Sequence, residues 1–417
     1  MFEVNDQGSG QLELDMMGKI ESMLEVRMSK MGNQLVWRQC KLGDIVSFQR
    51  GFDITQKDQQ KGHYPVVSSS GIKSYHSEGK VKSPGVVIGR KGTLGTVFYL
   101  DIDFWPHDTT LWVKDFHDNY PLFISYFLKE FNFEFYDVGS SNPTLNRNHI
   151  HLLPAVIPPL PEQKAIAAVL SSLDDKIDLL HRQNATLEAM AETLFRQWFV
   201  EEAQADWEEK PLCEVAIVQN GYAFSSKNYV DYEERHLEVF KMGHIKPGGG
   251  LRFSPKSDYV PRERKLEKWI LNKNDIVMAM TDMKDNMGIL AHPALIDESD
   301  KYVLNQRVAR IYVEKDSELI SNYLLYLFLK NEDSINFLQS QSNSGVQVNL
   351  STESIKSFPL LIPPRELQQK VLNIVGPVMT KINQNSSQIQ TLTKLRDNLL
   401  PKLMSGEVRV KLNEAGQ

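Results

Sequence analysis

The sequence predicts an α+β protein with a pseudo-two-fold internal repeat. Two similar mixed α/β domains are separated by two long helices that form an antiparallel coiled coil. Three observations predict this fold. Short runs of the first half return in the second, as Gln49–Phe52 does in Gln219–Tyr222. Each half ends in an apolar heptad pattern sustained for more than four heptads. The chain has 417 residues, more than a single hydrophobic core usually contains.

The repeat also predicts the domain boundaries. Trp37 opens one segment and Trp207 opens its equivalent 170 positions later, whereas Ile157–Pro159 returns as Ile362–Pro364 at an offset of 205. Phe127–Lys129 returns as Phe328–Lys330 at an offset of 201, so about thirty residues are inserted within the second domain. We expect a partly helical N-terminal extension over residues 1–35, a first domain over 36–157, a spacer helix over 158–206, a second domain over 207–361, a second spacer helix over 362–406 and a tail over 407–417.

The composition is that of an ordinary soluble protein, with 41% hydrophobic and 24% charged residues. No apolar run approaches the ~20 residues of a membrane span, and no signal peptide is evident. Cys40 and Cys213 form no CxxC pair, so we expect neither a disulfide framework nor a metal site, and a cytoplasmic location. The net charge of −6 argues against a general nucleic-acid coat protein, but local basic stretches still allow specific DNA binding.

Within each domain, short apolar runs between Gly- and Pro-bearing turns predict strands, and one helix follows them. In the first domain we expect strands over 85–89, 96–100 and 109–114 and a helix over 120–133. In the second we expect strands over 275–280, 288–291 and 307–313 and a helix over 321–330. The scaffold is therefore repeated, while the loops have diverged.

The two long helices carry the clearest pattern. In the first, one apolar row runs from Ile166 in steps of seven and a second runs from Leu170. In the second, the equivalent rows start at Val371 and Val375. Each helix has one Asn in its seam, at different heptad positions. An antiparallel pairing with residue numbers summing to 569 places Asn184 opposite Asn385, which would fix the register because a buried Asn costs stability unless paired. The alternative is two unrelated Asn residues on tolerant surfaces.

The sequence carries no recognisable catalytic motif. Gly89–Gly92 is too short for a phosphate-binding loop and lacks its Lys-Ser/Thr ending. His149 and His151 lack the spacing of metal ligands. Asp174 and Asp175 are expected on the outer face of the coiled coil as solvated charges. We therefore predict a chain that is not an enzyme and holds no metal.

The order domain–helix–domain–helix resembles the specificity subunit of type I restriction-modification systems. The resemblance covers residues ~36–410 and rests on Ile157–Lys164 at the start of the first helix, Leu194–Phe199 at its end and Leu395–Glu407 at the end of the second. The second helix start, Pro364–Gln369, departs from the family pattern.

The resemblance implies two target-recognition domains, each reading one half of a split double-stranded DNA site. It also implies that the helices dock two methyltransferase subunits, with motor-nuclease subunits joining for cleavage. S-adenosylmethionine, ATP and Mg would then be held by the partners, and this chain would hold no cofactor. The target would be an adenine that a partner flips out of the duplex for methylation.

Base reading requires side chains that reach the major groove, with Lys and Ser/Thr on phosphates. Turns and inserted loops present the candidates. In the first domain the candidates are Lys73, Tyr75, His76, Arg90, Lys91 and Thr93. In the second they are Lys246, Arg252, Lys256, Lys284, Asn286 and Arg307, of which Arg307 could instead pair with an acid inside its domain.

Two other interpretations stay open. The chain could be the recognition subunit of a fused nuclease-methyltransferase system, which would have the same architecture and a different partner. It could also be a spacer-adaptor whose domains bind protein or carbohydrate. The adaptor predicts no sequence-specific DNA binding even with methyltransferase subunits present.

Overall fold

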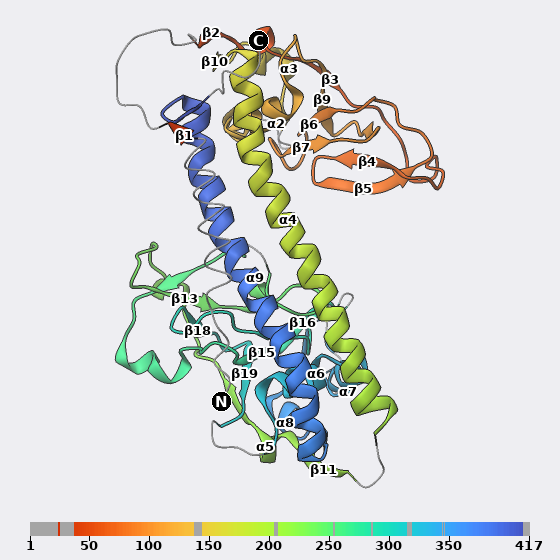
Figure 1. Cartoon of the computed structure of the whole chain (residues 1–417), viewed down its shortest axis with the longest axis vertical. Helices are drawn as coiled ribbons and strands as arrows, with labels where there is room; N and C mark the ends of the chain where they lie inside the picture. The colour runs from red at the N-terminus through yellow and green to blue at the C-terminus, as the bar shows by residue number, and fades with distance from the viewer. Residues whose placement is uncertain are drawn as a thin grey trace. The chain divides into compact units, whose positions relative to one another are not determined.

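The computed structural model describes residues 24–25, 37–136, 144–203, 207–252, 255–284, 287–314, 319–343, 345 and 347–411 (Figure 1). The chain forms two compact units. The first runs to Asp178 and resumes at Gln390, and the second covers Leu179–Ile389. Each unit contains one α/β domain with the adjoining parts of both long helices. The predicted helical extension over residues 1–35 lies outside the described residues except for strand β1 (Leu24–Glu25), which pairs with β22 (Arg409–Val410).

The first domain is built on a four-stranded antiparallel sheet of order β3-β9-β6-β7 and a three-stranded sheet of order β5-β4-β8. The four strands are β3 (Ser47–Arg50), β9 (Thr110–Asp115), β6 (Gly85–Gly89) and β7 (Val97–Leu100). The smaller sheet contains β5 (Gly71–His76), β4 (Tyr64–Ser68) and β8 (Trp105–Pro106). A ribbon of β2 (Arg38–Lys41) and β10 (Pro154–Ile157) leads into the long helix. The helices are η1 (Leu42–Asp44), α2 (Pro121–Lys129), η2 (Phe133–Tyr136) and α3 (Arg147–Ile150).

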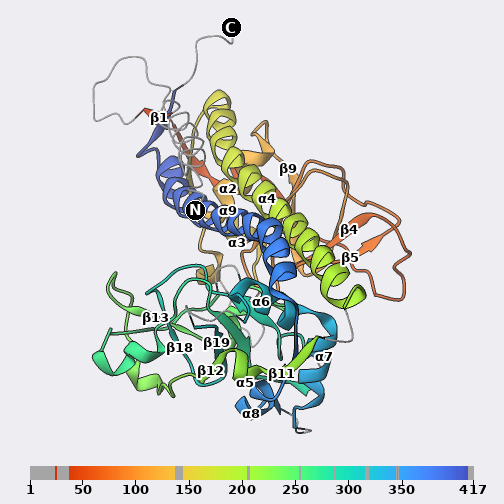
Figure 2. The same cartoon turned by 60° about the horizontal axis from the view of Figure 1, so that its bottom comes forward.

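The second domain repeats this topology, with strand orders β12-β19-β15-β17 and β14-β13-β18. Figure 2 brings this domain forward. Its four-stranded sheet contains β12 (Ile217–Asn220), β19 (Val308–Tyr312), β15 (Ile276–Ala279) and β17 (Pro293–Leu295). Its three-stranded sheet contains β14 (Tyr259–Val260), β13 (Leu237–Phe240) and β18 (Tyr302–Leu304). The ribbon is β11 (Glu208–Pro211) with β21 (Pro359–Ile362), and β16 (Thr281–Met283) pairs with β20 (Gln347–Asn349). The helices are α5 (Leu212–Val215), η4 (Ser226–Asn228), η5 (Met242–His244), η6 (Arg264–Trp269), α6 (Asn322–Lys330), α7 (Glu332–Ser340) and α8 (Thr352–Lys356).

A close backbone approach explains why a glycine returns in each repeat. Gly51 and Gly221 follow the first strand of each four-stranded sheet. A Cβ on Gly51 would lie 2.0 Å from the His107 carbonyl oxygen, and one on Gly221 would lie 2.2 Å from that of Asn305. No other residue fits such an approach without moving the backbone. The following aromatic residue of each repeat then bridges to the same loop, Phe52 to His107 and Tyr222 to Asn305.

Five predicted strands are confirmed, and none of their ends differs from the prediction by more than one residue. They are 85–89 (β6), 96–100 (β7), 109–114 (β9), 275–280 (β15) and 307–313 (β19). The prediction of a strand over 288–291 is wrong. Ala291 has a positive φ of 61°, and its N–H donates to the Ala279 carbonyl, so the chain turns before β17 begins. The helix predicted over 120–133 ends at Lys129, because the next N–H bonds to Leu128 and Phe127 in a tighter turn.

The long helices are α4 (Leu160–Arg196), continued by a π-helical turn over Gln197–Glu201, and α9 (Arg365–Ser405). Within each unit their segments run side by side in opposite directions (Figure 1). In the second unit, Lys370 lies over the Trp198 ring at 5.5 Å, while Asn385 meets Asn184. In the first unit, Arg396 pairs with Asp174. The predicted antiparallel coiled coil is confirmed.

Asn184 and Asn385 lie inside the seam of the second unit. Asn385 is fully buried and Asn184 is 8% exposed. The Asn385 Nδ2 donates to the Asn184 Oδ1 at 2.9 Å. The Asn184 Nδ2 in turn donates to the Ile382 carbonyl at 3.3 Å and to Ser386 Oγ at 3.2 Å. The register of this pair is the one that the heptad pattern predicts.

The expectation that Asp174 is a solvated charge is wrong. Its Oδ1 accepts from Arg396 Nη1 at 2.8 Å, and its Oδ2 accepts from the Tyr126 hydroxyl at 2.6 Å. Asp174 therefore joins the domain helix α2 to both long helices in the first unit. In the second unit Lys330 at the end of α6 pairs with Glu188 and Glu192 of α4, at 3.2 and 2.7 Å. The first domain is thus joined to α4 by a hydrogen bond from Tyr126, and the second domain is joined to α4 by the ion pairs of Lys330.

Candidate nucleic-acid interface

Several loops of the first domain are joined by contacts at the ends of its strands. The Arg90 and Lys91 N–H groups both donate to the Thr109 carbonyl, at 2.9 and 3.0 Å. The Ser69 N–H donates to Thr109 Oγ1 at 3.3 Å, and the Thr96 hydroxyl donates to the Ser69 carbonyl at 2.6 Å. Phe52 also bridges to His107 through its backbone. We call residues 50–53, 69, 89–96 and 107–109 the first junction.

Two guanidinium groups meet one aspartate in the first junction. Arg50 Nη2 lies 2.9 Å from Asp108 Oδ2, and Arg90 Nη1 donates to the Asp108 carbonyl at 3.3 Å. His107 Nδ1 lies 3.1 Å from Asp108 Oδ1. Burial lowers the pKa of Arg90, and the neighbouring charge of Arg50 lowers it further. Sequence reasoning found Arg90 but missed Arg50, His107 and Asp108, because only the sheet order brings these positions together.

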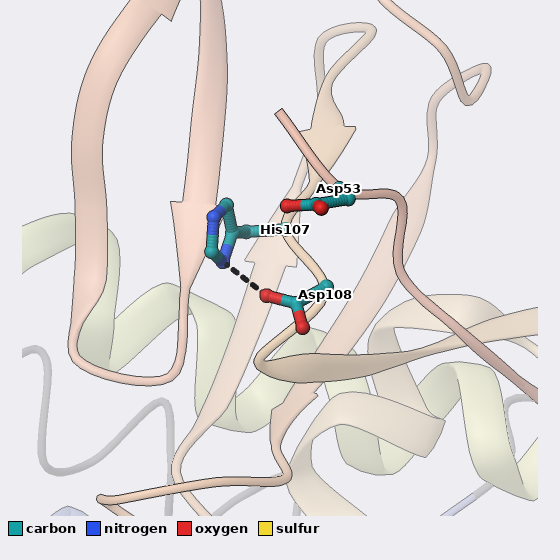
Figure 3. A group of neighbouring side chains, drawn as sticks. All are labelled: Asp53, His107 and Asp108. Carbon is teal, nitrogen blue, oxygen red and sulfur yellow. Dashed lines mark ion pairs between the residues drawn. The ribbon is translucent and has the colours of Figure 1, made fainter. Parts of the chain in front are cut away.

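Asp53, His107 and Asp108 place one potential metal-ligand atom each within 4.8 Å of one another (Figure 3). However, both oxygens of Asp108 already face a partner, Arg50 on one side and His107 on the other. The positive charges of Arg50 and Arg90 would also oppose a divalent cation. We therefore interpret this group as a hydrogen-bonded support for the arginines.

The other predicted residues of the first domain occupy different positions. Lys73 and Tyr75 lie on β5, where Tyr75 is 54% exposed, and Thr93 is exposed in the β6–β7 loop. Lys91 is half-buried and bridges to Thr144 through its backbone. His76 instead points into the domain.

His76 is only 7% exposed. Its Nδ1 accepts from the Gln60 N–H at 3.0 Å, and its ring meets the edge of Trp105 at 5.3 Å. These contacts satisfy the side chain inside the domain and support the β4–β5 hairpin. Contact between His76 and DNA would require this packing to open.

The second domain has an equivalent junction, which we define as residues 220–223, 280–284, 287–290 and 305–307. The Met280 N–H donates to the Arg307 carbonyl at 3.0 Å, as the Arg90 N–H does to Thr109. The Gln306 N–H donates to the Tyr222 carbonyl at 3.0 Å. The Arg307 side chain is exposed, and no acid among the described residues pairs with it. Arg307 therefore presents a guanidinium group at the surface.

A glycine turn and a second loop adjoin this junction. Gly248, Gly249 and Gly250 all have positive φ, which turns the chain sharply after Lys246. The Gly248 N–H donates to the Gly288 carbonyl at 2.9 Å, so this turn meets the loop that contains Lys284. Asp282 closes the loop by accepting from the Ile289 N–H at 2.9 Å.

The predicted lysines and arginine of this region are exposed, namely Lys246, Arg252, Lys256 and Lys284. Asn286 lies outside the described residues. Exposed guanidinium and ammonium groups on loops can donate to phosphates, and a guanidinium can also donate to base edges.

Comparison with known families identifies the chain. A family model described as the type I restriction modification DNA specificity domain matches residues 35–189 and again residues 204–394. The chain belongs to this family. Each match contains one α/β domain and most of the helix that follows, so the chain carries two copies of the specificity domain.

Relatives in the family support the same architecture. The MjaIX specificity subunit of Methanocaldococcus jannaschii is 26% identical, and the match covers 66% of this chain and 65% of that protein. The MjaVIII specificity subunit of the same organism is 23% identical over 90% of this chain and 93% of that protein. The crystal structure of the M. genitalium type I S subunit has a TM-score of 0.58 at 17% identity, covering 90% of this chain and 98% of that one.

The specificity subunits have a recognition role without catalysis, which agrees with the prediction that this chain is not an enzyme. No helix in the described part of the chain is both long and apolar enough to cross a membrane.

Proposed function

We propose that this chain reads a bipartite DNA site, with each α/β domain recognising one half. The observation that carries the proposal is the repetition of one scaffold with different side chains on its loops. In both domains a backbone N–H donates to a carbonyl of the loop that follows the three-stranded sheet. The Arg90 N–H donates to the Thr109 carbonyl in the first domain, and the Met280 N–H donates to the Arg307 carbonyl in the second. The side chains at these loops differ in charge and shape, as two different half-sites would require.

The proposal includes partners that bind the long helices. Two methyltransferase subunits would dock there and hold S-adenosylmethionine, and motor-nuclease subunits would hold ATP and Mg. This chain would hold no cofactor and would act in the cytoplasm. The duplicated arrangement of domain and helix supports two equivalent docking surfaces, one in each repeat. The chemistry on the flipped adenine would then belong entirely to the partners.

The experiment is a methylation map of host DNA. Single-molecule sequencing of DNA from the source cell should reveal methylated adenines within a motif of two short blocks separated by a fixed gap. Deletion of this gene should remove that methylation, and a plasmid copy should restore it. An unchanged map after deletion would contradict the proposal.

A pull-down with the tagged full chain separates the remaining alternatives. Separate methyltransferase and motor-nuclease polypeptides would support a type I assembly. A single polypeptide with both activities would indicate the fused system instead. If the chain is instead an adaptor that binds protein or carbohydrate, a gel-shift assay with methyltransferase subunits present would show no sequence-specific binding of duplex DNA.

A further inference from the structure

The two junctions share a backbone frame. In each domain, the loop between the three-stranded and four-stranded sheets carries three consecutive residues, 107–109 in the first and 305–307 in the second. A glycine packs directly against the first carbonyl of each loop. Gly51 packs against the His107 carbonyl, and Gly221 packs against the Asn305 carbonyl. Each loop also closes on itself, because the Thr110 N–H donates to the His107 carbonyl at 2.9 Å and the Val308 N–H donates to that of Asn305 at 3.0 Å. The backbone of this loop is therefore fixed in the same way twice.

On this shared frame the side chains differ at every matched position. The first loop reads His-Asp-Thr and the second reads Asn-Gln-Arg. The strand before Gly51 ends in Arg50, and the strand before Gly221 ends in Asn220. Asn220 accepts from the Thr352 hydroxyl and is thereby held within its own domain. Each junction consequently presents an exposed arginine, but from a different position of the frame.

We infer that Arg50 in the first domain and Arg307 in the second are specificity-determining residues that each contact a guanine in the major groove, and that Asp108 positions Arg50. This inference rests on the proposed function and deepens it. An arginine donates two parallel hydrogen bonds to the O6 and N7 of guanine, a pattern that no other base pair presents in the same way. The two arginines occupy different frame positions, so the two domains read different sequences.

The geometry favours Arg50 over its neighbours in the first junction. The Arg50 side chain is 54% exposed, and Asp108 holds it through one Nη2 contact. This contact occupies one of the two Nη2 hydrogens, so the other Nη2–H can still form a fork with either Nε–H or Nη1–H and face a ligand. Arg90 is half-buried and uses Nη1 on the Asp108 carbonyl, and Lys91 lacks the planar fork needed for two parallel bonds. Asp108 restricts the rotamers of Arg50 and so reduces the entropy lost on binding.

The experiment selects binding sites from duplex DNA with randomised positions, using the full chain in complex with the methyltransferase subunits of its host. The variants are Arg50→Lys, Arg307→Lys and Asp108→Asn. Each Arg→Lys change keeps the charge, and so the phosphate attraction, but removes the fork. Arg38→Lys on β2 and Arg262→Lys, which pairs with Glu267 and Asp300, are matched controls for the first and second domains. Melting temperatures of all complexes check that folding is intact.

We expect Arg307→Lys to lower the preference for one guanine in one half-site by about tenfold and to leave the other half-site unchanged. Arg50→Lys should do the same at one guanine of the opposite half-site. Asp108→Asn should relax that same position at an unchanged melting temperature, whereas a purely structural role would weaken all positions together. The controls should leave the selected motif intact.

Two outcomes overturn the inference and are distinguishable. If the wild-type complex selects no split motif, the proposed function itself fails. If it selects a split motif that Arg50→Lys and Arg307→Lys leave intact at every position, only the assignment of these residues fails. An arginine that touches phosphate alone would give this second result, because the substituted lysine still neutralises the phosphate.

Discussion

A buried glutamine performs the same task in both repeats. Gln163 Nε2 donates to the Pro158 carbonyl at 2.9 Å, and Gln368 Nε2 donates to the Pro363 carbonyl at 2.8 Å. Each side chain also ties the helix start to its domain, Gln163 by accepting from the Tyr120 N–H and Gln368 by donating to the Leu319 carbonyl. The second helix start departs from the family sequence pattern, yet it keeps the residue that satisfies these buried groups.

His151 makes the first domain sensitive to acid. Its Nε2 accepts from the Phe48 N–H at 3.0 Å, which requires the neutral ring. Burial lowers the pKa of His151 below its ordinary value of 6.5, and nearby Arg147 and His117 lower it further. In the unfolded chain the ring takes up its proton near pH 6.5, before the folded form does. The stabilisation is therefore complete above pH 6.5 and is lost as the pH falls from there through the pKa of the folded state.

We expect the first unit to lose stability between pH 7.5 and pH 5.5 in part through this histidine. His151→Gln should lower the melting temperature at pH 7.5 and flatten its decline toward pH 5.5, because glutamine does not titrate. Thermal unfolding of both proteins across this range is the measurement. The solvent-facing His149→Gln change is the control, and equal slopes for wild type and His151→Gln would contradict the assignment.

At the scale of elements, the helical pair depends on one polar layer. The Asn385 amide donates to the Asn184 Oδ1 within a largely apolar seam that includes Leu180, Ile382 and Ile389. Replacing one Asn by Leu leaves the other with unmet hydrogen-bonding groups, which costs about 1–3 kcal/mol. Replacing both restores an apolar layer, as the rest of the seam already has.

We therefore expect Asn184→Leu or Asn385→Leu alone to destabilise the second unit, and the double variant to recover much of the loss. Chemical denaturation in a double-mutant cycle gives the coupling energy. Asn398→Leu, at an exposed position of α9, controls for the change in helix propensity and side-chain volume. A double variant whose effect equals the sum of the single effects would show that the two residues do not act as a pair.

The elements differ in how far the sequence predicts them. The heptads of α4 and α9 and the buried strand β6 follow from local periodicity, which the sequence displays directly. The parallel pairing of β4 with β8 and of β13 with β18 joins segments that are far apart in the chain, and no local pattern encodes it. For the same reason, the sequence predicted only some residues of the first junction. Arg90 lies in a conspicuous Gly-rich turn, whereas Arg50 and Asp108 are linked only by the pairing of β3 with β9.

At the scale of the whole molecule, strand β22, which follows the second long helix, completes the first unit. Arg409 Nη2 donates to Glu162 Oε2 at 2.7 Å, and the Trp37 Nε1 donates to the same oxygen at 3.1 Å. Glu162 is only 2% exposed, so removal of Arg409 would leave a buried carboxylate without its ion-pair partner. Leu367 occupies the equivalent position in the second unit. There the Trp207 Nε1 has no hydrogen-bond partner within the described part of the chain.

Arg409→Ala should destabilise the first unit by an amount near the lower end of about 3–5 kcal/mol, because Arg409 is partly exposed. Adding Glu162→Leu should recover most of the loss, since the second unit tolerates Leu367 beneath an unpaired Trp207. Amide hydrogen exchange should show faster exchange in the first unit of Arg409→Ala and no change in the second. Lys411→Ala on the same tail is the control, and failure of Glu162→Leu to rescue would show that the charge is not the cause.

The molecule carries a net charge of −6, so attraction to DNA must come from local surfaces such as the two junctions. Each lost phosphate contact lowers the slope of log affinity against log salt by about one. Among the described residues, Lys91 makes no side-chain hydrogen bond or ion pair, whereas Arg90 Nη1 donates to the Asp108 carbonyl. We expect Arg90→Ala with Lys91→Ala to give weaker binding and a shallower slope. Lys91→Ala alone should produce most of the change in slope.

The measurement is the affinity of the complex for DNA at a series of salt concentrations from about 50 to 300 mM. Lys82→Ala is the control, because Lys82 precedes β6 while Arg90 follows it, and its charge is paired with Asp103 at 2.7 Å. An unchanged slope in the double variant would place the phosphate-binding surface of the first domain elsewhere. A large loss of affinity at an unchanged slope would instead indicate that the β6–β7 loop shapes the surface without contacting phosphate, since counterion release depends only on the charges that meet the DNA backbone.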